Sequence, residues 1–282
     1  MKNLRVKCPA KINLTLEIIN KREDGFHNIK SIMQLIDLYD YLDISVEKSD
    51  RTKIVLSGNS NEIPYNEKNI VFKATDTFLK KLGDECYTIS INIDKNIPVA
   101  AGLAGGSTDA AGTIFGLNTV FDNILSDEEL NELCASLGSD LNVCLNGGCL
   151  LATSRGEFIE HLPVIEKTVT LIKPKNLGIS AKEAYTKYSE KDYKPQNNMT
   201  EKMTDALISN EDITPYLYND LEYAIFEDYE ELKYIKRILP DSIMSGSGST
   251  YFLLRDYSGN LGDDYQIIRN LHFISNGVQI DQ

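Results

Sequence analysis

Three separated segments of this sequence combine small residues with polar side chains that could bind phosphate. The first, Pro9–Leu14, contains Lys11 and Asn13; the second, residues 98–108, is rich in glycine; the third, residues 245–249, alternates serine and glycine. Glycine lets a backbone approach a ligand closely, and a lysine can stabilise developing negative charge. Phosphoryl transfer depends on positioning and charge stabilisation more than on covalent catalysis, so it is the chemistry that these segments suit.

The glycine-rich segment lies between a predicted strand and a predicted helix, for which Ser107 is the expected N-cap. The first N–H groups of a helix have no intrahelical partner and the dipole is positive there, so such a turn can hold an anion. No lysine or arginine occurs from Asn96 to Ser154, so an anion bound by this stretch must be held without local cationic side chains. Taken alone, the turn is also compatible with a purely structural role.

Several familiar phosphate-binding and metal-binding motifs are absent from the sequence. No Gly-Lys dipeptide occurs, which excludes a Walker A loop, and glycines at 102, 105 and 106 do not fit the pattern G-x-G-x-x-G. The His-Arg-Asp and Asp-Phe-Gly motifs of protein kinases are also absent. The five cysteines include no C-x-x-C pair, so we expect buried reduced thiols rather than disulfides or a zinc site.

The composition is that of a globular protein with a sizeable core. The chain has 282 residues, 42% of them hydrophobic and 25% charged, and two domains of roughly 140 residues are the default for this length. A net charge of −13 argues against a nucleic-acid partner. No apolar run reaches the ~18 residues of a membrane span, and the N-terminus lacks the apolar stretch of a signal peptide. We therefore expect a cytoplasmic protein without a membrane partner.

Hydrophobic periodicity and turn signals predict a chain of mixed strands and helices that could position these segments. The expected strands are Leu4–Ile18 with a bend or bulge at Pro9, Phe26–Ile44, Lys53–Leu56, Tyr87–Ile93, Val169–Ile172 and Thr250–Leu254. The expected helices are Glu67–Leu82, one after Ser107, Leu130–Leu137 behind a capping box at Ser126–Glu129, a short one capped by Ser180, and Asn219–Leu239.

Other stretches are expected to be irregular or exposed. Gly138–Asp140 is predicted to end the helix before it, Cys144–Ala152 to form a strand and a turn, and Ser189–Thr200 to form a loop. Acidic residues on the outer face of the last helix, from Glu222 to Glu231, are expected to be solvated and to account for part of the negative charge.

Taken together, in this order and spacing, the three segments resemble the motifs of the GHMP small-molecule kinases. Sharper marks are Asp24–His27, Leu137–Asp140 and Asn219–Glu222, and the resemblance covers nearly the whole chain, thinning after Arg255. It implies a two-domain α+β fold, with an N-terminal domain (residues 1–157) similar to domain 2 of a ribosomal protein. A ferredoxin-like C-terminal domain (residues 158–282) would follow, with the active site in the cleft between the two.

The marks point to the branch of the family that uses ATP to phosphorylate the 2-hydroxyl of methylerythritol in a cytidine diphosphate substrate, on the non-mevalonate route to isoprenoid precursors. The resemblance implies that Asp140 is the base and Lys11 the cation beside it. Mg²⁺ should accompany ATP, with Ser107, Thr108 and Asp140 as candidate ligands. The residues implied for ATP binding are Pro98, Val99, Ala100, Ala101, Gly102, Leu103, Ala104, Gly105, Gly106, Ser107 and Thr108.

Asn13 lies two strand residues after Lys11 and therefore faces the same way, where it suits a hydrogen bond to the substrate. The resemblance implies Phe26, His27 and Tyr185 around the cytosine. An aromatic face stacks on any base, whereas an imidazole can select the cytosine edge by hydrogen bonding. The sequence departs from the family pattern where Ala100 and Ala101 replace glycine, Phe26 replaces tyrosine and Ala181 replaces a hydroxyl residue. We expect a monomer or a weak homodimer that binds small molecules and no nucleic acid.

Plainer interpretations stay open at this point. Lys11, Asn13, Thr15 and Glu17 could form a solvated strand face, Asp140 could be a turn carboxylate, and the aromatic rings could be ordinary packing residues. The chain could also be a GHMP kinase for a simpler alcohol, such as homoserine or mevalonate, or a non-catalytic nucleotide-binding protein on this fold.

Overall fold

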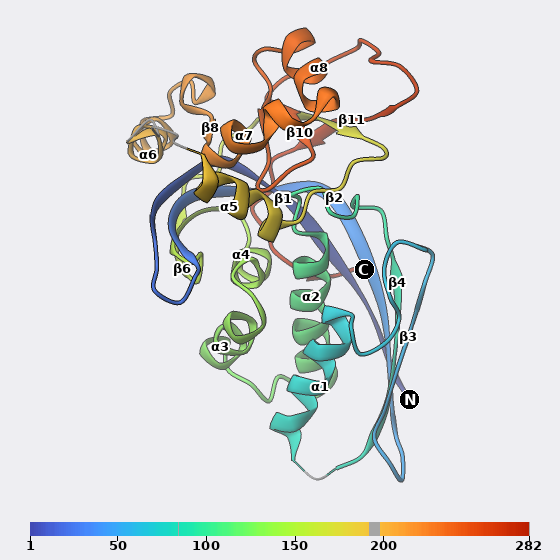
Figure 1. Ribbon diagram of the computed structural model, residues 1–282. Coiled ribbons are helices and arrows are strands. Elements are labelled where there is room, and N and C mark those ends of the chain that lie inside the picture. Colours follow the sequence, from blue (N-terminus) through green and yellow to red (C-terminus); the bar gives the residue numbers. More distant parts are fainter. Residues whose placement is uncertain (84, 192–197, 282) are drawn as a thin grey trace.

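The computed structural model describes residues 1–83, 85–191 and 198–281. In this part of the chain the larger sheet has the strand order β12-β1-β2-β4-β3, with β5 and β6 continuing from β2 and β8 beside β1 (Figure 1). Its strands are β1 (Lys2–Lys21), β2 (His27–Lys48), β3 (Lys53–Gly58), β4 (Tyr87–Asp94), β5 (Cys149–Ser154), β6 (Phe158–Leu162), β8 (Tyr218–Asn219) and β12 (Gln279–Ile280).

A smaller sheet has the order β11-β7-β10-β9. Its strands are β7 (Thr168–Pro174), β9 (Ile243–Met244), β10 (Tyr251–Leu253) and β11 (Tyr265–His272). The helices are α1 (Ile70–Leu82), α2 (Gly105–Val120), α3 (Asp127–Leu137), α4 (Asp140–Asn146), α5 (Ala181–Glu190), α6 (Met199–Ser209), α7 (Asp220–Ile225) and α8 (Glu230–Ile238), with short 3₁₀ turns at Thr214–Tyr216 and Phe226–Asp228. This mixed architecture confirms the α+β fold class.

The long antiparallel pair β1 and β2 connects the two parts of the larger sheet. Residues 41–48 of β2 pair with β4, whereas residues 29–34 pair with β5. Opposite the part of β2 between these stretches, β1 changes register at Pro9/Ala10, which confirms the bulge expected at Pro9. A second shift, between Asn13 and Thr15, lies opposite the part of β2 that pairs with β5. Because bulges bend a strand and redirect its side chains, Lys11 and Asn13 lie at the bend where β2 changes partner.

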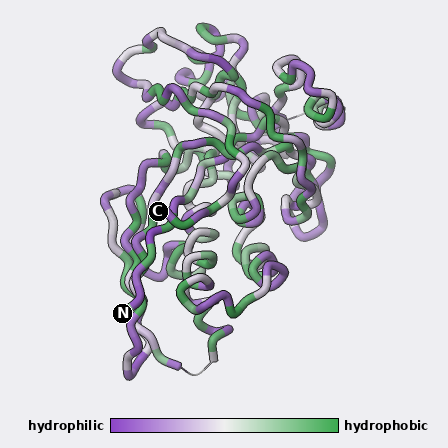
Figure 2. The backbone as a smooth tube through the Cα atoms, turned by 180° about the vertical axis from the view of Figure 1, so that it is seen from behind, coloured by the Kyte–Doolittle hydropathy of each residue, from purple (hydrophilic) through white to green (hydrophobic). Residues whose placement is uncertain are grey.

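Helix α2 packs against the larger sheet, and Figure 1 shows α1–α4 together on one side of its long strands. Gly112 and Gly116 face the sheet, where a Cβ on either would lie 2.3 Å from Cys8 Sγ or 2.5 Å from Ile44 Cδ1. In the view from behind, purple and green stretches alternate along the strands near the two termini (Figure 2). This alternation is the period of two that predicted the strands.

Two expectations about the last long helix are wrong. Asn219–Leu239 is interrupted: α7 ends at Ile225, a 3₁₀ turn follows, and α8 begins at Glu230. Because of the break, the two helices pack against different elements. A single helical period over the whole segment therefore predicts the buried and exposed faces incorrectly. Glu222 is buried rather than solvated; its carboxylate pairs with Lys236 Nζ at 2.9 Å and accepts from Met244 N at 2.8 Å.

The predicted ends of other elements need smaller corrections. Asp140 opens α4 instead of ending α3, which Gly138 terminates, and Cys144 belongs to α4, so β5 begins only at Cys149. The capping box of Ser126 and Glu129 is confirmed. Within Ser189–Thr200, α5 continues to Glu190 and α6 begins at Met199, while residues 192–197 lie outside the described residues.

Two further sequence expectations concern the cysteines and the domain boundary. All five cysteines are free thiols, four of them buried and Cys86 half-buried. The expected boundary at residues 157 and 158 lies in the turn between β5 and β6, which both belong to the larger sheet, and β8 and β12 return to that sheet. The division into two domains therefore stays a prediction. No helix in the described ranges has the length and apolar character needed to cross a bilayer.

The tight contact between α2 and β1 gives a stability prediction. Gly112→Ala should lower the free energy of unfolding by about 1–3 kcal/mol, because overpacking against Cys8 outweighs the gain in helix propensity. The double variant Cys8→Ala with Gly112→Ala should recover most of this loss in urea unfolding, since the sulfur is the nearest obstacle. A Gly112→Ala variant as stable as the parent would contradict the close packing.

Candidate active site

Lys11 on β1 lies at the centre of the site. Its side chain is only 4% exposed, yet three acceptors surround its ammonium: Asn13 Oδ1 at 2.7 Å, the Gly102 carbonyl at 3.1 Å and Asp140 Oδ2 at 3.6 Å. A buried ammonium is tolerated only when its donors are satisfied. The arrangement brings together the strand, the glycine-rich loop and the start of α4.

Asp140 is the acidic partner of this lysine. Its side chain is 33% exposed, compared with 4% for Lys11, and it faces the cleft from the first turn of α4. A carboxylate is favoured in this first turn because the helix dipole is positive there. The result is a carboxylate that a ligand can reach, with a cation held beside it by the protein.

Asn13 holds Lys11 in place and is itself held. Its Nδ2 donates to Ser31 Oγ at 2.8 Å, and the Ser31 hydroxyl donates in turn to the Thr15 carbonyl at 2.6 Å. An amide nitrogen carries two hydrogens, so one remains for a ligand, as the sequence resemblance expects. Sequence reasoning missed Ser31, whose position opposite Leu16 in the β1–β2 register gives no signal of this contact.

The alternative of a solvated strand face is wrong. Lys11, Asn13, Thr15 and Glu17 are all at most 5% exposed. Glu17 accepts from the backbone N–H groups of Met199 and Thr200 at the start of α6. The same period-two pattern describes a buried polar face as well as an exposed one, so pattern alone could not decide between them.

The glycine-rich loop points its carbonyl groups into the protein. The Ala100 carbonyl accepts from Ile179 N, that of Ala101 from Thr250 N, and that of Leu103 from Lys11 N. The Gly102 carbonyl accepts from Ser245 Oγ at 2.9 Å as well as from Lys11 Nζ. With these carbonyls engaged, the first-turn N–H groups of α2, which have no intrahelical partner, can serve an anion in the cleft.

Glycine is required where this loop meets the serine–glycine segment. Gly102 has φ +75°, and a Cβ there would lie 2.0 Å from the Ser245 carbonyl oxygen. Gly246 has φ +54°, and its Cβ would approach the Gly102 carbonyl, Asn13 Oδ1 and Lys11 Nζ at 3.1–3.2 Å. Ala100 also adopts a positive φ of 49°, so the alanine found in place of glycine keeps the loop conformation at some cost in strain.

The predicted N-cap of α2 is wrong. The helix begins at Gly105, two residues before Ser107, after Ala104 in the left-handed conformation with no side-chain cap. Ser107 is therefore a first-turn residue, half-buried at the cleft, whereas Thr108 is fully buried and does not line it. A glycine-rich start hides the boundary because serine is the stronger N-cap signal.

The aromatic residues predicted around cytosine line the same cleft. The His27 and Tyr185 rings stack with centroids 5.2 Å apart and an interplanar angle of 20°, and His27 Nε2 lies 3.2 Å from Ser189 Oγ. Burial, aided by Lys21, lowers the pKa of His27. Phe26 is exposed, with the Arg155 guanidinium 5.5 Å from its ring centroid.

One cleft of about 1340 Å³ contains all the sequence-predicted site residues except Thr108. Lys11, Asn13 and Asp140 line it between the loop, residues 98–107, and the aromatic residues Phe26, His27 and Tyr185. Sequence reasoning missed the other cations on its wall, which come from distant elements: Lys21, Lys68, Lys95, Arg155 and Lys182. The cleft thus brings together the glycine-rich loop, a Lys–Asp pair and aromatic rings.

Comparison with known proteins agrees with this geometry. The family model for the GHMP kinases N terminal domain matches residues 69–150. A solved homoserine kinase from Cytophaga hutchinsonii has the same fold, with a TM-score of 0.78 at 17% identity, covering 100% of this chain and 98% of its own. The chain therefore shares the fold of the GHMP kinases.

More similar proteins narrow this class. The 4-diphosphocytidyl-2-C-methyl-D-erythritol kinase of Caldanaerobacter subterraneus subsp. tengcongensis is 36% identical over 280 residues, covering 95% of this chain and 92% of its own. A crystal structure of 4-(cytidine 5'-diphospho)-2C-methyl-D-erythritol kinase superposes with a TM-score of 0.77 at 26% identity, covering 96% and 100%. The chain belongs to the 4-diphosphocytidyl-2-C-methyl-D-erythritol kinase family, as the sequence resemblance indicated.

Asn219 is a residue on which the loop geometry depends. Its Nδ2 donates to the Met244 and Gly246 carbonyls at 2.7 and 2.8 Å, and its Oδ1 caps α7 through Leu221 N at 2.9 Å. Asn219→Asp would keep the cap but place a carboxylate oxygen against two carbonyl oxygens. We expect at least about a tenfold loss of kinase activity and a stability loss of about 1–3 kcal/mol.

Asn260→Asp is the matched control, because the exposed Asn260 also accepts a backbone N–H, from Gly262, through Oδ1. It should leave activity and melting temperature unchanged. If Asn219→Asp and Asn260→Asp had the same kinase activity and melting temperature, Asn219 would not hold the serine–glycine segment.

Proposed function

We propose that this chain catalyses the ATP-dependent phosphorylation of the 2-hydroxyl of 4-diphosphocytidyl-2-C-methyl-D-erythritol in the non-mevalonate route to isoprenoid precursors. The observation that carries the proposal is the contact between Lys11 Nζ and Asp140 Oδ2, 3.6 Å long, in the cleft beside the glycine-rich loop. The names of the relatives supply the substrate, and the geometry supplies the roles of the residues.

In the proposed reaction the substrate hydroxyl oxygen forms a bond to the γ-phosphorus of ATP as the bond to the β–γ bridging oxygen breaks. Asp140 accepts the hydroxyl proton, and ADP leaves with the electron pair of the broken bond. Lys11 stabilises the negative charge near the attacking oxygen, where a buried cation acts more strongly than in water. Asn13 keeps the ammonium aimed at the carboxylate.

Residues Pro98 to Ser107 would hold the ATP phosphates, with the first-turn N–H groups of α2 as the donors; Thr108 is fully buried and its N–H donates to the Ala104 carbonyl. The fit rests on the loop itself, whose carbonyls are engaged by the protein and whose Gly106 is exposed to the cleft. A larger side chain at position 106 would obstruct a phosphate in the cleft. A loop that binds through backbone groups needs no lysine of its own, which agrees with the cation-free stretch from Asn96 to Ser154.

Mg²⁺ fits the residues present. Among the described residues no group of three or more His, Cys, Asp or Glu side chains could hold a metal, but Mg²⁺ in such enzymes uses few protein ligands and relies on substrate phosphates and water. Asp140 and Ser107 line the cleft and are the better candidate ligands; Thr108 is fully buried. When bound, the ion would neutralise charge on the transferred phosphoryl group.

The aromatic end of the cleft favours a cytidyl substrate over a simple alcohol. Homoserine or mevalonate has no ring to stack, whereas Tyr185, His27 and Phe26 offer ring faces and an imidazole within one cleft. The fold alone cannot decide, since a homoserine kinase shares it. A non-catalytic nucleotide-binding role is disfavoured because the Lys11–Asp140 pair is intact. A monomer or weak homodimer without nucleic-acid partners remains our prediction.

The roles of the central pair can be tested by substitution. Asp140→Asn and Lys11→Met should each lower kcat by about 100- to 10,000-fold, the range for loss of an acid–base or charge-stabilising group. Turnover is measured by ADP release with the cytidyl substrate. Binding of ATP in the absence of Mg²⁺ should persist in Asp140→Asn, because the loop is unchanged.

Asp127→Asn and Lys7→Met serve as controls. Asp127 is an exposed residue at the start of α3, and Lys7 lies four residues before Lys11 on β1, outside the cleft. Both controls should retain the parental kcat. Full activity of the Asp140→Asn variant would show that Asp140 is not the base.

The cytosine contact can be tested at His27. His27→Ala should raise the KM for the cytidyl substrate about tenfold or more through loss of a hydrogen bond, with little change in the KM for ATP. Because the pKa of His27 is lowered, the ring is neutral at pH 7–8, so substrate affinity should change only in acid, below the ordinary histidine pKa.

His161→Ala is the control, since His161 is exposed on β6 and does not line the cleft. A small alcohol turned over as well as the cytidyl substrate would refute the substrate assignment and leave the kinase assignment standing.

A further inference from the structure

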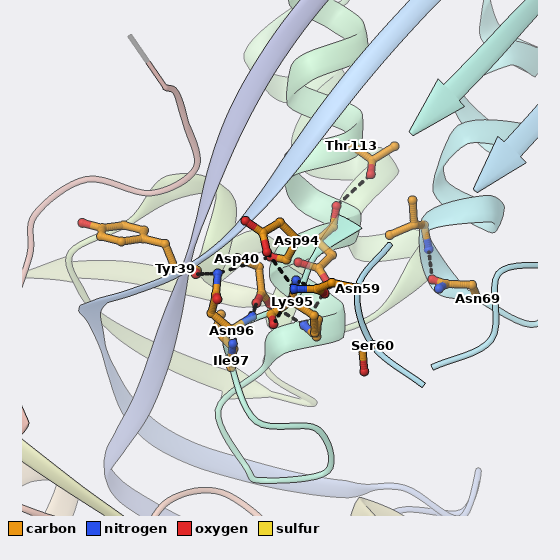
Figure 3. A network of polar contacts seen from close by, with 12 residues as sticks. Tyr39, Asp40, Asn59, Ser60, Asn69, Asp94, Lys95, Asn96, Ile97 and Thr113 are labelled. Atoms are coloured by element: carbon orange, nitrogen blue, oxygen red, sulfur yellow. Dashed lines mark hydrogen bonds and ion pairs between the residues drawn. The ribbon is translucent and has the colours of Figure 1, made fainter. Parts of the chain in front are cut away.

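Asp40 on β2 is fully buried and binds the backbone immediately before the glycine-rich loop. Its Oδ1 accepts from Asn96 N at 2.6 Å and from Ile97 N at 2.8 Å, the two residues that precede Pro98. Figure 3 shows Asp40 beside Lys95, Asn96 and Ile97. The carboxylate thus fixes the chain where it enters the loop.

Lys95 connects this entry point to the helix that follows the loop. Its ammonium donates to Asp40 Oδ2 and, at 2.9 Å, to Asp109 Oδ2 in the second turn of α2. The three side chains are at most 5% exposed. Asn59 holds the Lys95 backbone N–H at 2.8 Å, also visible in Figure 3. The segment 95–109 is therefore tied to β2 at its start and, through Lys95, at its end.

Burying these three charged side chains to connect three elements carries a cost in desolvation free energy. Two nearly buried carboxylates share one ammonium. Asp109 Oδ1 has no hydrogen-bond partner among the described residues, and burial raises the pKa of Asp109. Well-packed apolar residues are often as stabilising as a buried ion cluster. What such residues cannot do is accept two adjacent backbone N–H groups and fix their direction.

The cluster also adjoins the groups that would bind phosphate. Lys95 and Asp109 line the cleft, and a Cβ on Gly105, the first residue of α2, would lie 2.8 Å from Lys95 Nζ. A shift of Lys95 would therefore move or loosen the first turn of α2. If this turn is already ordered before ATP binds, less conformational entropy is lost on binding.

We propose that Asp40 is a positioning residue for the phosphate-binding loop: with Lys95 and Asp109, it holds both ends of segment 95–109 so that the first-turn N–H groups of α2 are ordered before the nucleotide arrives. The proposal rests on the proposed function insofar as ATP is the ligand of the loop. Asp40 does not line the cleft.

The test compares nucleotide binding with substrate use in two variants. Asp40→Asn keeps an oxygen for the Asn96 and Ile97 N–H groups but places an amide against the Lys95 ammonium; Asp40→Ala removes both interactions. Calorimetric titration with ATP should show Kd raised about threefold or more for Asp40→Asn and about tenfold or more for Asp40→Ala, by loss of preorganisation. The KM for the cytidyl substrate should change less than about twofold.

Hydrogen exchange provides the readout that separates positioning from general stability and remains available if Asp40→Ala fails to fold. Without nucleotide, amides in segment 95–109 of Asp40→Asn should exchange faster than in the parent, whereas amides of the smaller sheet should not. Saturating ATP should reduce the difference. Asp43→Asn, on the same strand in an exposed pair with Arg5, should match the parent in every measurement.

The outcomes are distinct. Parental ATP affinity in Asp40→Asn, or equal weakening for ATP and the cytidyl substrate, would overturn the proposal for Asp40. Failure of the parent protein itself to bind ATP would instead overturn the proposed function.

Discussion

The requirement to satisfy one buried ammonium organises the site. The Lys11 side chain is only 4% exposed, so its donors must find acceptors within the protein. The three that it finds come from different parts of the chain: Asn13 on the same strand, the Gly102 carbonyl in the loop, and Asp140 at the start of α4. A single side chain thus sets the position of the base relative to the loop, and the bend of β1 places that side chain where the three parts meet.

The loop conformation follows from the same contacts. Lys11 donates its backbone N–H to the Leu103 carbonyl and its ammonium to the Gly102 carbonyl, which also accepts from Ser245 Oγ. Thr250 N donates to the Ala101 carbonyl, so the backbone is oriented with its acceptors inward. The donors of the first turn of α2 are then left for a ligand. The close contact between Gly102 and Gly246 makes this possible, because side chains would separate the two segments.

Much of this arrangement was predictable from the sequence, and the failures have identifiable causes. Local signals located β1, the capping box of α3 and the helix carrying Tyr185 correctly, because periodicity and capping act over a few residues. The burial of Glu222 and the break before Tyr229 depend on Lys236 and on packing against distant elements. Ser31, Asn219 and the Asp40–Lys95–Asp109 cluster act through contacts 14–55 residues apart or between neighbouring strands, which no local pattern reports.

The acidity of the chain is compatible with polyanionic ligands because the cations near the loop are already compensated. Lys95 faces two carboxylates and Lys11 faces one, so their side chains add no net positive charge to the loop. At the loop itself a phosphate is then attracted mainly by N–H dipoles, which act at short range and in defined directions, although Lys21, Lys68, Arg155 and Lys182 also line the cleft. Binding by such dipoles depends on geometry, because an anion gains little free energy unless its oxygens meet the donors. Rigid support beneath the loop therefore matters, because it fixes the direction of these donors.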